Sequence, residues 1–404
     1  MIYFKISIIF IIIFFACSSN LNKSLERKED VIIINLDNSS INTNDVFLLS
    51  SIYKNIRTII LETNELCLIG SLTKLRVYDP YIIILDSDIA KSVLVFDLNG
   101  RFLRKIGSIG QGPGEFYHPN DFTVDKNKKE IYVLDGMLCR INKYDLNTGK
   151  YLSSIILNKD IRSFNIEYVE GVLFADAYFN KHSDNNYLLR IIQDPSGKIV
   201  DHFVNVKEYN KGLSNRSYIH NNVFHLRENG NAVFFQPLMD KIIEITKENV
   251  SLFLEIKSKD LITADIIKTA IEKNSMSYML DLMQYNKYFK ISDFIENRNM
   301  ILFNYQIGSN IRLVMYNKQT NVVRIILKRR DDLFYINSVS RSPAPKVGCF
   351  DSLGVYFFYD TSQVSMIQQL ASQGSLSPKL DKLEKLIHLE EDANPVIFYY
   401  EFIE

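Results

Sequence analysis

A segment of about fifty residues occurs twice in succession, and this duplication constrains the fold more than any other feature of the chain. The two copies are YIIILDSDIAKSVLVFDLNGRFLRKI and EIYVLDGMLCRINKYDLNTGKYLSSI. Asp86 corresponds to Asp135 at a separation of 49 residues, and Gly100 corresponds to Gly149 at the same separation. Each copy is typical of a strand ending in Asp, a short turn, a second strand, a turn around Asn and Gly, and a third strand.

Later segments keep this rhythm of strand, turn and strand but share fewer letters. They include YLLRIIQDPSGKIVDHF, NMILFNYQIGSNIRLVMYNKQTNVVRI and GVYFFYDTSQVSMI. A period near fifty residues with three or four short antiparallel strands per unit is typical of a β-propeller, in which radial repetition protects the sheet edges. Counting the units from Arg57 onward gives six. We therefore predict an all-β fold, a six-bladed β-propeller that spans residues 49–404.

The two ends of this region indicate how the ring closes. One strand, from Tyr53, precedes the first clear blade, and another, from Pro395, ends the chain. Because a propeller has to join its last blade to its first, we expect these two strands to share one sheet.

Two stretches have helical rather than strand periodicity. A helical insertion is predicted at about residues 261–286, in which Thr263 caps a helix that carries Ile267 and Ala270 on one face. Apolar residues further along this insertion, Met283 among them, either pack on the blade or bind a partner. A short helix from Ser377 is predicted just before the closing strand.

The N-terminus is typical of an export signal followed by a tether. Residues 1–16, MIYFKISIIFIIIFFA, hold one lysine before an apolar core of signal-peptide length, which is short for a membrane span. Residues 17–48 follow as a flexible tether and N-terminal segment. Ala16 before Cys17 resembles the lipobox of bacterial lipoproteins, which implies cleavage before Cys17 and lipidation of that residue. A plain secretory signal with a chance cysteine is the alternative.

Charge and cysteine content argue against two kinds of site. Lys and Arg together number 47, as do Asp and Glu, so no net basic field attracts nucleic acid. The three cysteines after Cys17 are Cys67, Cys139 and Cys349, and their spacing fits no zinc pattern. Each lies among apolar neighbours, so we expect buried free thiols.

The stretch GSIGQGPGEFYHPND, residues 107–121, concentrates glycine, proline and polar residues. Phosphate-binding glycines stand between a strand and a helix, whereas here a strand follows. We interpret the stretch as a corner between two blades, in which the glycines supply positive φ angles. Because such crossings reach one end of the central channel, they also supply the candidates for a ligand-binding rim, which are Gln111, Glu115, His118 and Asp121.

The segment RKIGSIGQGPGEFYHPNDFTVDKNKKEIYVLDGMLCRINKYDLNTGKYL resembles an NHL-type repeat. This segment, with RTIILETNELCLIGSLTKL and the C-terminal NPVIFYYEF, resembles the six-bladed β-propeller lipoproteins of gut-type anaerobic bacteria. The resemblance runs from Arg57 to the C-terminus and is specific in the second and third units. It implies a cell-envelope protein anchored in the outer membrane through lipid, on the periplasmic or the surface side.

Two functions agree with these features. We expect a monomeric, non-catalytic lipoprotein that binds a glycan, a peptide or another envelope protein and needs no cofactor. The alternative is an NHL-type lyase or lactonase of the envelope, with calcium or another divalent metal in the channel. Asp86 and Asp135, at equivalent strand ends, are the candidate metal ligands, although such residues also serve as turn acceptors. The sequence contains no Gly-x-Ser-x-Gly and no His-Glu-x-x-His, so we assign no catalytic residue.

Overall fold

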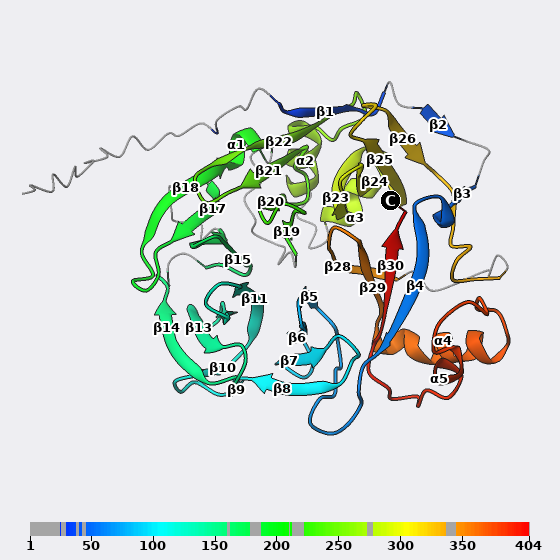
Figure 1. Ribbon diagram of the computed structural model, residues 1–404. Coiled ribbons are helices and arrows are strands. Elements are labelled where there is room, and N and C mark those ends of the chain that lie inside the picture. Colours follow the sequence, from blue (N-terminus) through cyan, green and yellow to red (C-terminus); the bar gives the residue numbers. More distant parts are fainter. Residues whose placement is uncertain are drawn as a thin grey trace, which may run out of the picture.

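The structure is a computed structural model that describes residues 25, 30–37, 40–42, 46–159, 162–177, 187–209, 211, 222–272, 278–336 and 345–403. Within these residues, six sheets of four or five strands stand around a common centre (Figure 1). Each sheet forms one blade, from an inner strand beside the centre to an outer strand at the rim. The predicted six-bladed β-propeller is therefore confirmed.

The first three blades follow one another along the chain. Blade 1 consists of β5 (Lys74–Tyr78), β6 (Tyr81–Asp86), β7 (Ser92–Asp97) and β8 (Phe102–Ile106). Blade 2 consists of β11 (Pro119–Asp125), β12 (Glu130–Asp135), β13 (Arg140–Asp145) and β14 (Tyr151–Ile156). Blade 3 consists of β15 (Ile166–Val169), β16 (Val172–Asp176), β17 (Tyr187–Ile192) and β18 (Ile199–Asn205).

The other three blades are each joined by a strand from the N-terminal segment that precedes β5. Blade 4 contains β19 (Phe224–Leu226), β20 (Ala232–Phe234), β21 (Lys241–Ile245) and β22 (Val250–Lys257). Blade 5 contains β23 (Tyr288–Glu296), β24 (Met300–Ile307), β25 (Asn310–Asn317) and β26 (Val323–Ile326). Blade 6 contains β28 (Lys346–Phe350), β29 (Gly354–Tyr359), β30 (Val396–Phe402) and β4 (Tyr53–Ile60).

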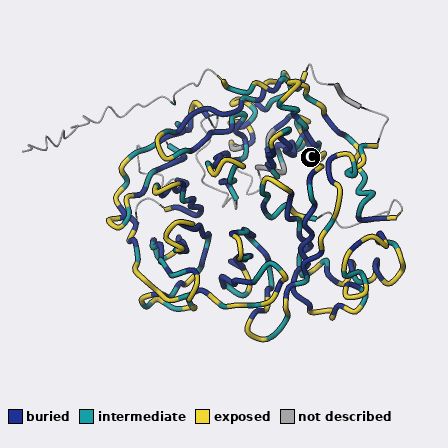
Figure 2. Tube along the Cα trace, in the orientation of Figure 1, coloured by how far each residue is buried: buried dark blue, intermediate teal, exposed yellow. Residues whose placement is uncertain are grey.

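The core consists of the layers between neighbouring blades, as the buried strands in Figure 2 show. In β6, Ile82 and Ile84 pack with blade 6, whereas Ile83 and Leu85 pack with blade 2, and all four are 0% exposed. Burying an aliphatic side chain is worth about 1.5–3 kcal/mol. Strands of a blade are therefore apolar on both faces and lack the alternation of apolar and polar residues found in a strand with one face in solvent.

The ring closes where the predicted N-terminal and C-terminal strands meet. β4 pairs antiparallel with β30, from Ile60 opposite Val396 to Tyr53 opposite Phe402. The Tyr53 ring also stacks on the Phe402 ring, with centroids 5.5 Å apart. The expectation that these strands share one sheet is confirmed, so blade 6 unites both ends of the propeller sequence.

The segment before β4 does not remain separate from the ring. β1 (Ile32–Asn35) pairs in parallel with β22, β2 (Ser40–Asn42) with β26, and β3 (Phe47–Leu48) with β27 (Arg329–Arg330). The later part of the predicted N-terminal segment therefore adds short strands to the outer side of the ring, whereas the run predicted to be flexible, residues 18–30, lies outside the described residues except for Leu25 and Asp30. The physical reason for this pairing is the apolar run that contains Ile34, because burying this side chain favours pairing with the open edge of an outer strand.

Short helices lie in the connections. α1 (Val206–Tyr209) follows β18, and α2 (Ala264–Glu272) and α3 (Tyr278–Met283) lie between β22 and β23. Ile267, Ala270 and Leu282 of this insertion pack around Leu238 beside blade 4, and Met283 is packed against them. Packing on the blade is thus the role the structure gives to the apolar face. No helix in the described parts of the chain is long and apolar enough to cross a membrane.

The connection between β29 and β30 differs from the sequence prediction. The segment from Gly354 is predicted to form a strand, a turn and a second strand, but a helix, α4 (Thr361–Ser372), stands in place of the second strand. Asp360 and Gln363 form a capping box, and the apolar side of the helix packs in the blade 6 core. The helix predicted from Ser377 is confined to α5 (Leu383–Ile387), which lies beside α4 (Figure 1).

Candidate functional site

The glycine-rich stretch is a corner between blades 1 and 2. It leaves β8, forms a short parallel pair between β9 (Ser108–Ile109) and β10 (Glu115–Phe116), and enters β11. Gly107 has a φ of +65°, and a Cβ there would lie 2.6 Å from the Phe116 ring. Arg140 and Asn142 donate to the Glu115 carbonyl at 2.6 Å and 2.7 Å. The corner is therefore fixed to blade 2 by its backbone.

The four predicted rim residues lie at different depths of this corner. Gln111 is exposed, and the Glu115 carboxylate turns back to accept from the Gly112 amide at 2.8 Å. His118 is half-buried, with its Nδ1 enclosed and unpaired among the described residues. Only Asp121, which is 3% exposed, reaches the inner part of the ring. The four residues thus extend from the corner loop to the inner strand β11, and a ligand-binding rim here stays a prediction.

Asp86 and Asp135 act as clamps between the loops of their blades. The Asp135 carboxylate accepts from the amides of Tyr117 and His118 at 2.6 Å and 3.1 Å, and from those of Met137 and Leu138 at 3.0 Å and 2.9 Å. In blade 1, Asp86 accepts equivalent bonds, whose donors are the amides of Gly70, Ser71 and Ile89. Their oxygens already have donors, which is the turn-acceptor role.

Metal-ligating side chains do not converge within the described ranges. No group of three or more His, Cys, Asp or Glu residues there has the arrangement to hold a metal ion. Cys67, Cys139 and Cys349 are buried and free, as predicted. Cys17 lies outside the described residues.

Charged side chains instead meet between the inner strands of blades 1, 2 and 3. Lys74 Nζ lies 2.6 Å from Asp121 Oδ1, and Arg76 Nη2 lies 3.6 Å from Glu167 Oε2. The Thr123 hydroxyl donates to Glu167 at 2.5 Å. Burial lowers the pKa of Lys74 and raises the pKa of Asp121. The network connects the three inner strands, and loss of one partner would leave a buried uncompensated group.

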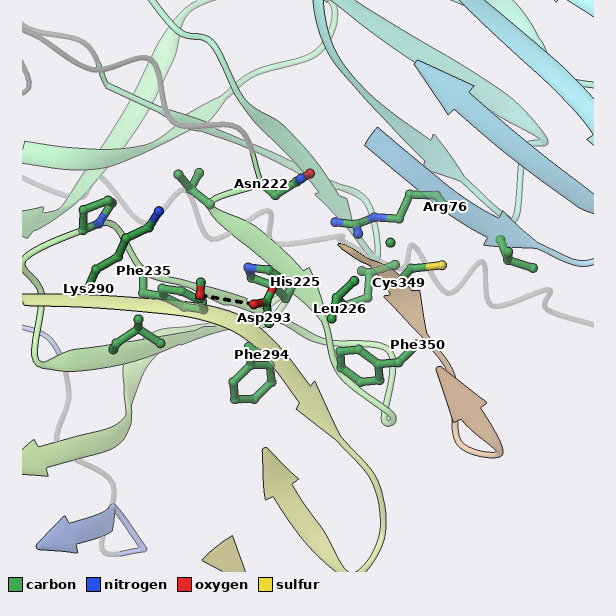
Figure 3. Close-up of a pocket in the computed structure, with 17 residues that line it drawn as sticks. Arg76, Asn222, His225, Leu226, Phe235, Lys290, Asp293, Phe294, Cys349 and Phe350 are labelled. Atoms are coloured by element: carbon green, nitrogen blue, oxygen red, sulfur yellow. Dashed lines mark hydrogen bonds between the residues drawn. The ribbon is translucent and has the colours of Figure 1, made fainter. Parts of the chain in front are cut away.

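A cavity of about 320 Å³ lies beside this network, at the centre of the ring. Its walls come from the inner strands β5, β19, β23 and β28 and from the chain next to them, so four blades contribute (Figure 3). The polar or ionisable residues that line it are Arg76, Asn222, His225, Lys290, Ser292, Asp293 and Cys349. This size is at the lower end of the range for small-molecule sites.

Two lining residues carry buried polar atoms without a partner. Arg76 Nη2 donates to the Phe224 carbonyl at 2.8 Å, but Arg76 Nε is buried and has no hydrogen-bond partner in the described chain. Asn222 Nδ2 donates to the Thr73 carbonyl at 3.4 Å, whereas Asn222 Oδ1 is buried and unpaired within the same residues. A buried polar atom without a partner costs about 1–3 kcal/mol.

Aromatic rings and neutral groups complete the cavity wall. The His225 imidazole stacks on Phe235 with centroids 4.9 Å apart and an interplanar angle of 5°. Burial, with Arg76 and Lys74 nearby, lowers the pKa of His225 to about 3, so the ring is neutral at pH 7 and offers one donor and one acceptor. Burial also raises the pKa of Cys349 to about 12, which keeps it a thiol.

Sequence reasoning did not identify this cavity. Arg76 and Asn222 are 146 residues apart in the chain, and Asp293 follows a further 71 residues on, so no local spacing connects them. One signal was available, namely a charged residue inside an otherwise apolar inner strand. Arg76 in KLRVY and Glu167 in IEYV are examples.

The chain belongs to the family described as a domain of unknown function, DUF4934, whose pattern matches residues 31–401. Among solved structures it is similar to a "putative exported protein" from Bacteroides fragilis, at 18% identity and a TM-score of 0.73 over 93% of this chain and 100% of that one. It is also similar to a member of the DUF4221 family from Bacteroides vulgatus, at 10% identity and a TM-score of 0.46 over 87% and 97%. No curated protein matches the chain.

Proposed function

We propose that the protein is an exported, membrane-tethered binding lipoprotein that holds a sugar unit of a glycan in its central cavity. Export and tethering are supported by the apolar residues 1–16 and by Cys17, where lipidation would supply the anchor. The name of the Bacteroides fragilis protein, which refers to export, agrees with this. The NHL-like corner at residues 107–121 supports a kinship with propellers of that repeat class.

The observation that carries the proposal is the pair of unpaired buried atoms, Arg76 Nε and Asn222 Oδ1, in the cavity wall. One is a donor and the other an acceptor, and neutral His225 adds both capacities. Sugar hydroxyls donate and accept at the same atom, so a sugar satisfies a mixed set of this kind. The apolar face of a sugar ring can pack on a partly exposed aromatic residue of the wall, Phe350.

Binding without catalysis is supported by the protonation of the cavity groups. The raised pKa of Cys349 leaves no thiolate at neutral pH, and the lowered pKa of His225 makes its imidazole a weak base. Neither group is therefore adjusted for nucleophilic or general-base chemistry near pH 7.

A glycan array tests the proposal with the chain from Ser18 on, which keeps every residue that the structure describes. We expect at least one glycan to bind, with affinity reduced at least tenfold by Asn222→Ala and by Lys290→Met. Lys257→Met, an exposed substitution on the outer strand β22, is the matched control and leaves binding unchanged. Absence of any bound glycan, or equal binding by all three variants, would refute the sugar site.

The anchor has its own test. Expressed with its signal in a bacterial host, the wild-type chain should incorporate a labelled fatty acid and sediment with membranes. The variant Cys17→Ala should lose the label. Label that persists in the variant would contradict lipidation at Cys17.

A further inference from the structure

A second cavity, of about 500 Å³, lies between blades 5 and 6. Its walls come from β23, β24 and β25 on one side and from β28, β29 and β30 on the other. The chain around β3 and β27 forms its outer end. Asp293 and Val347 line this cleft as well as the central cavity, so the cleft extends from the centre of the ring toward the rim.

Most of the cleft wall is apolar. The side chains come from both blades and from the N-terminal segment, and they include Leu48, Leu49, Ile295, Leu302, Leu313 and Phe357. Leu48 is 41% exposed at the outer end, whereas Leu302 is 1% exposed in the interior. Packed blades normally leave no such space, because interiors are filled at crystal-like density. A cavity of this size accommodates a small amphipathic molecule.

The outer end of the cleft is cationic. Three consecutive residues, Lys328, Arg329 and Arg330, contribute to its lining. Arg329 donates to Asn304 at 3.3 Å, and Arg330 Nη2 donates to the Ile336 carbonyl at 2.8 Å. Arg330 Nε is buried and has no partner among the residues described. A guanidinium N–H that lacks an acceptor at the wall of a cavity is suited to an anionic group.

The two carboxylates of the cleft do not neutralise these cations directly. Asp293 accepts from the Asn304 amide at 2.6 Å, and Asp331 accepts from the Tyr400 hydroxyl at 2.6 Å. Burial raises the pKa of Asp331. The cleft therefore combines an apolar interior with a cationic end.

From this combination we propose that the cleft between blades 5 and 6 is a second ligand site, which takes an anionic amphiphile. Its carboxylate or phosphate group lies at Arg329 and Arg330, and its alkyl or aryl part packs against Leu302 and Phe357. The site adjoins the proposed sugar site at Asp293 and Val347 but differs from it in chemistry, because its occupant is held by an apolar wall and a cationic end rather than by the groups around His225.

The test measures binding of three probes with equal chains, decanoate, decanol and decyltrimethylammonium, by calorimetry on the chain from Ser18 on. We expect decanoate to bind with one site and at least tenfold more tightly than decyltrimethylammonium. Arg330→Gln should weaken decanoate at least tenfold without affecting decanol, and Arg329→Gln provides a second variant of the same kind. Leu48→Gln should weaken decanoate and decanol alike.

Arg324→Gln is the matched control, because this exposed arginine on β26 is not among the residues that line the cleft. Vesicles of phosphatidylglycerol distinguish the source of the anion: competition with decanoate assigns the site to a membrane lipid, and its absence assigns it to a free amphiphile. Equal affinity for decanoate and decyltrimethylammonium would overturn the proposal. So would decanoate binding that neither arginine variant weakens.

Discussion

The carboxylate of Asp135 offers a direct measure of how much a blade depends on its clamp. It is 0% exposed and accepts from four backbone amides, two in the corner before β11 and two in the turn between β12 and β13. At about 1 kcal/mol for each hydrogen bond, Asp135→Ala should lower the free energy of unfolding by about 4 kcal/mol. Asp135→Asn keeps one oxygen acceptor and should cost about half as much. A loss of 4 kcal/mol is a large part of the 5–15 kcal/mol typical of whole domains.

Urea unfolding followed by circular dichroism provides the measurement, with an unchanged m-value as the condition for comparing midpoints. Asp97→Ala is the matched control, because the Asp97 carboxylate accepts from two amides, those of Asn99 and Arg101, in an exposed turn where water can replace it. We expect the control to cost less than about 1 kcal/mol. If Asp135→Ala costs no more than Asp97→Ala, the clamp does not hold the corner.

Three further predictions concern closure, pH and metals. Truncation after Asp392 removes β30 and should give insoluble or protease-sensitive protein, whereas removal of residues 1–30 should leave a protease-resistant ring. Limited proteolysis compares the two proteins, and a protease-resistant C-terminal truncation would contradict closure by β4 and β30. Burial raises the pKa of Asp176 to about 6, so the stability that this carboxyl contributes is complete below the unfolded pKa near 3.8 and is lost as pH rises through 6. Asp176→Asn should therefore flatten the dependence of melting temperature on pH between 4 and 6, and an unchanged slope would contradict this assignment. Because Asp86 and Asp135 already accept from backbone amides, neither calcium nor EDTA should shift the melting temperature by more than roughly 1–2 °C, the scatter of repeated melting curves. A larger rise of the melting temperature with calcium would support the two aspartates as metal ligands.

The blades could be predicted from the sequence because each one repeats the same local chemistry. Asp86 and Asp135 end equivalent strands, and the turns after them are set by hydrogen bonds within a few residues. Gly100 and Gly149 both take positive φ, so the turn chemistry that first suggested the repeat is visible in the backbone. Signals of this kind survive in a single sequence because they act locally.

The elements that were missed depend on tertiary context or on a weaker local signal. The run from Asp360 was interpreted as turn and strand, although Asp360 and Gln363 have the spacing of a capping box. The pairing of β1 with β22 could not be derived, because it joins Ile34 to Ile256 across more than 200 residues. Both cavities likewise consist of side chains from separate blades, which only the closed ring brings together.

The parallel pairing of β1 with β22 has a mechanical consequence. Tension applied to the chain ahead of Ile32 would pull along the strand, so the bonds between β1 and β22 would be sheared together rather than opened one at a time. The pairings of β2 and β3 follow before the chain reaches β4. A pull from the N-terminal side is thus resisted at blade 4 before it reaches the pairing of β4 with β30, so the ring remains closed under this load.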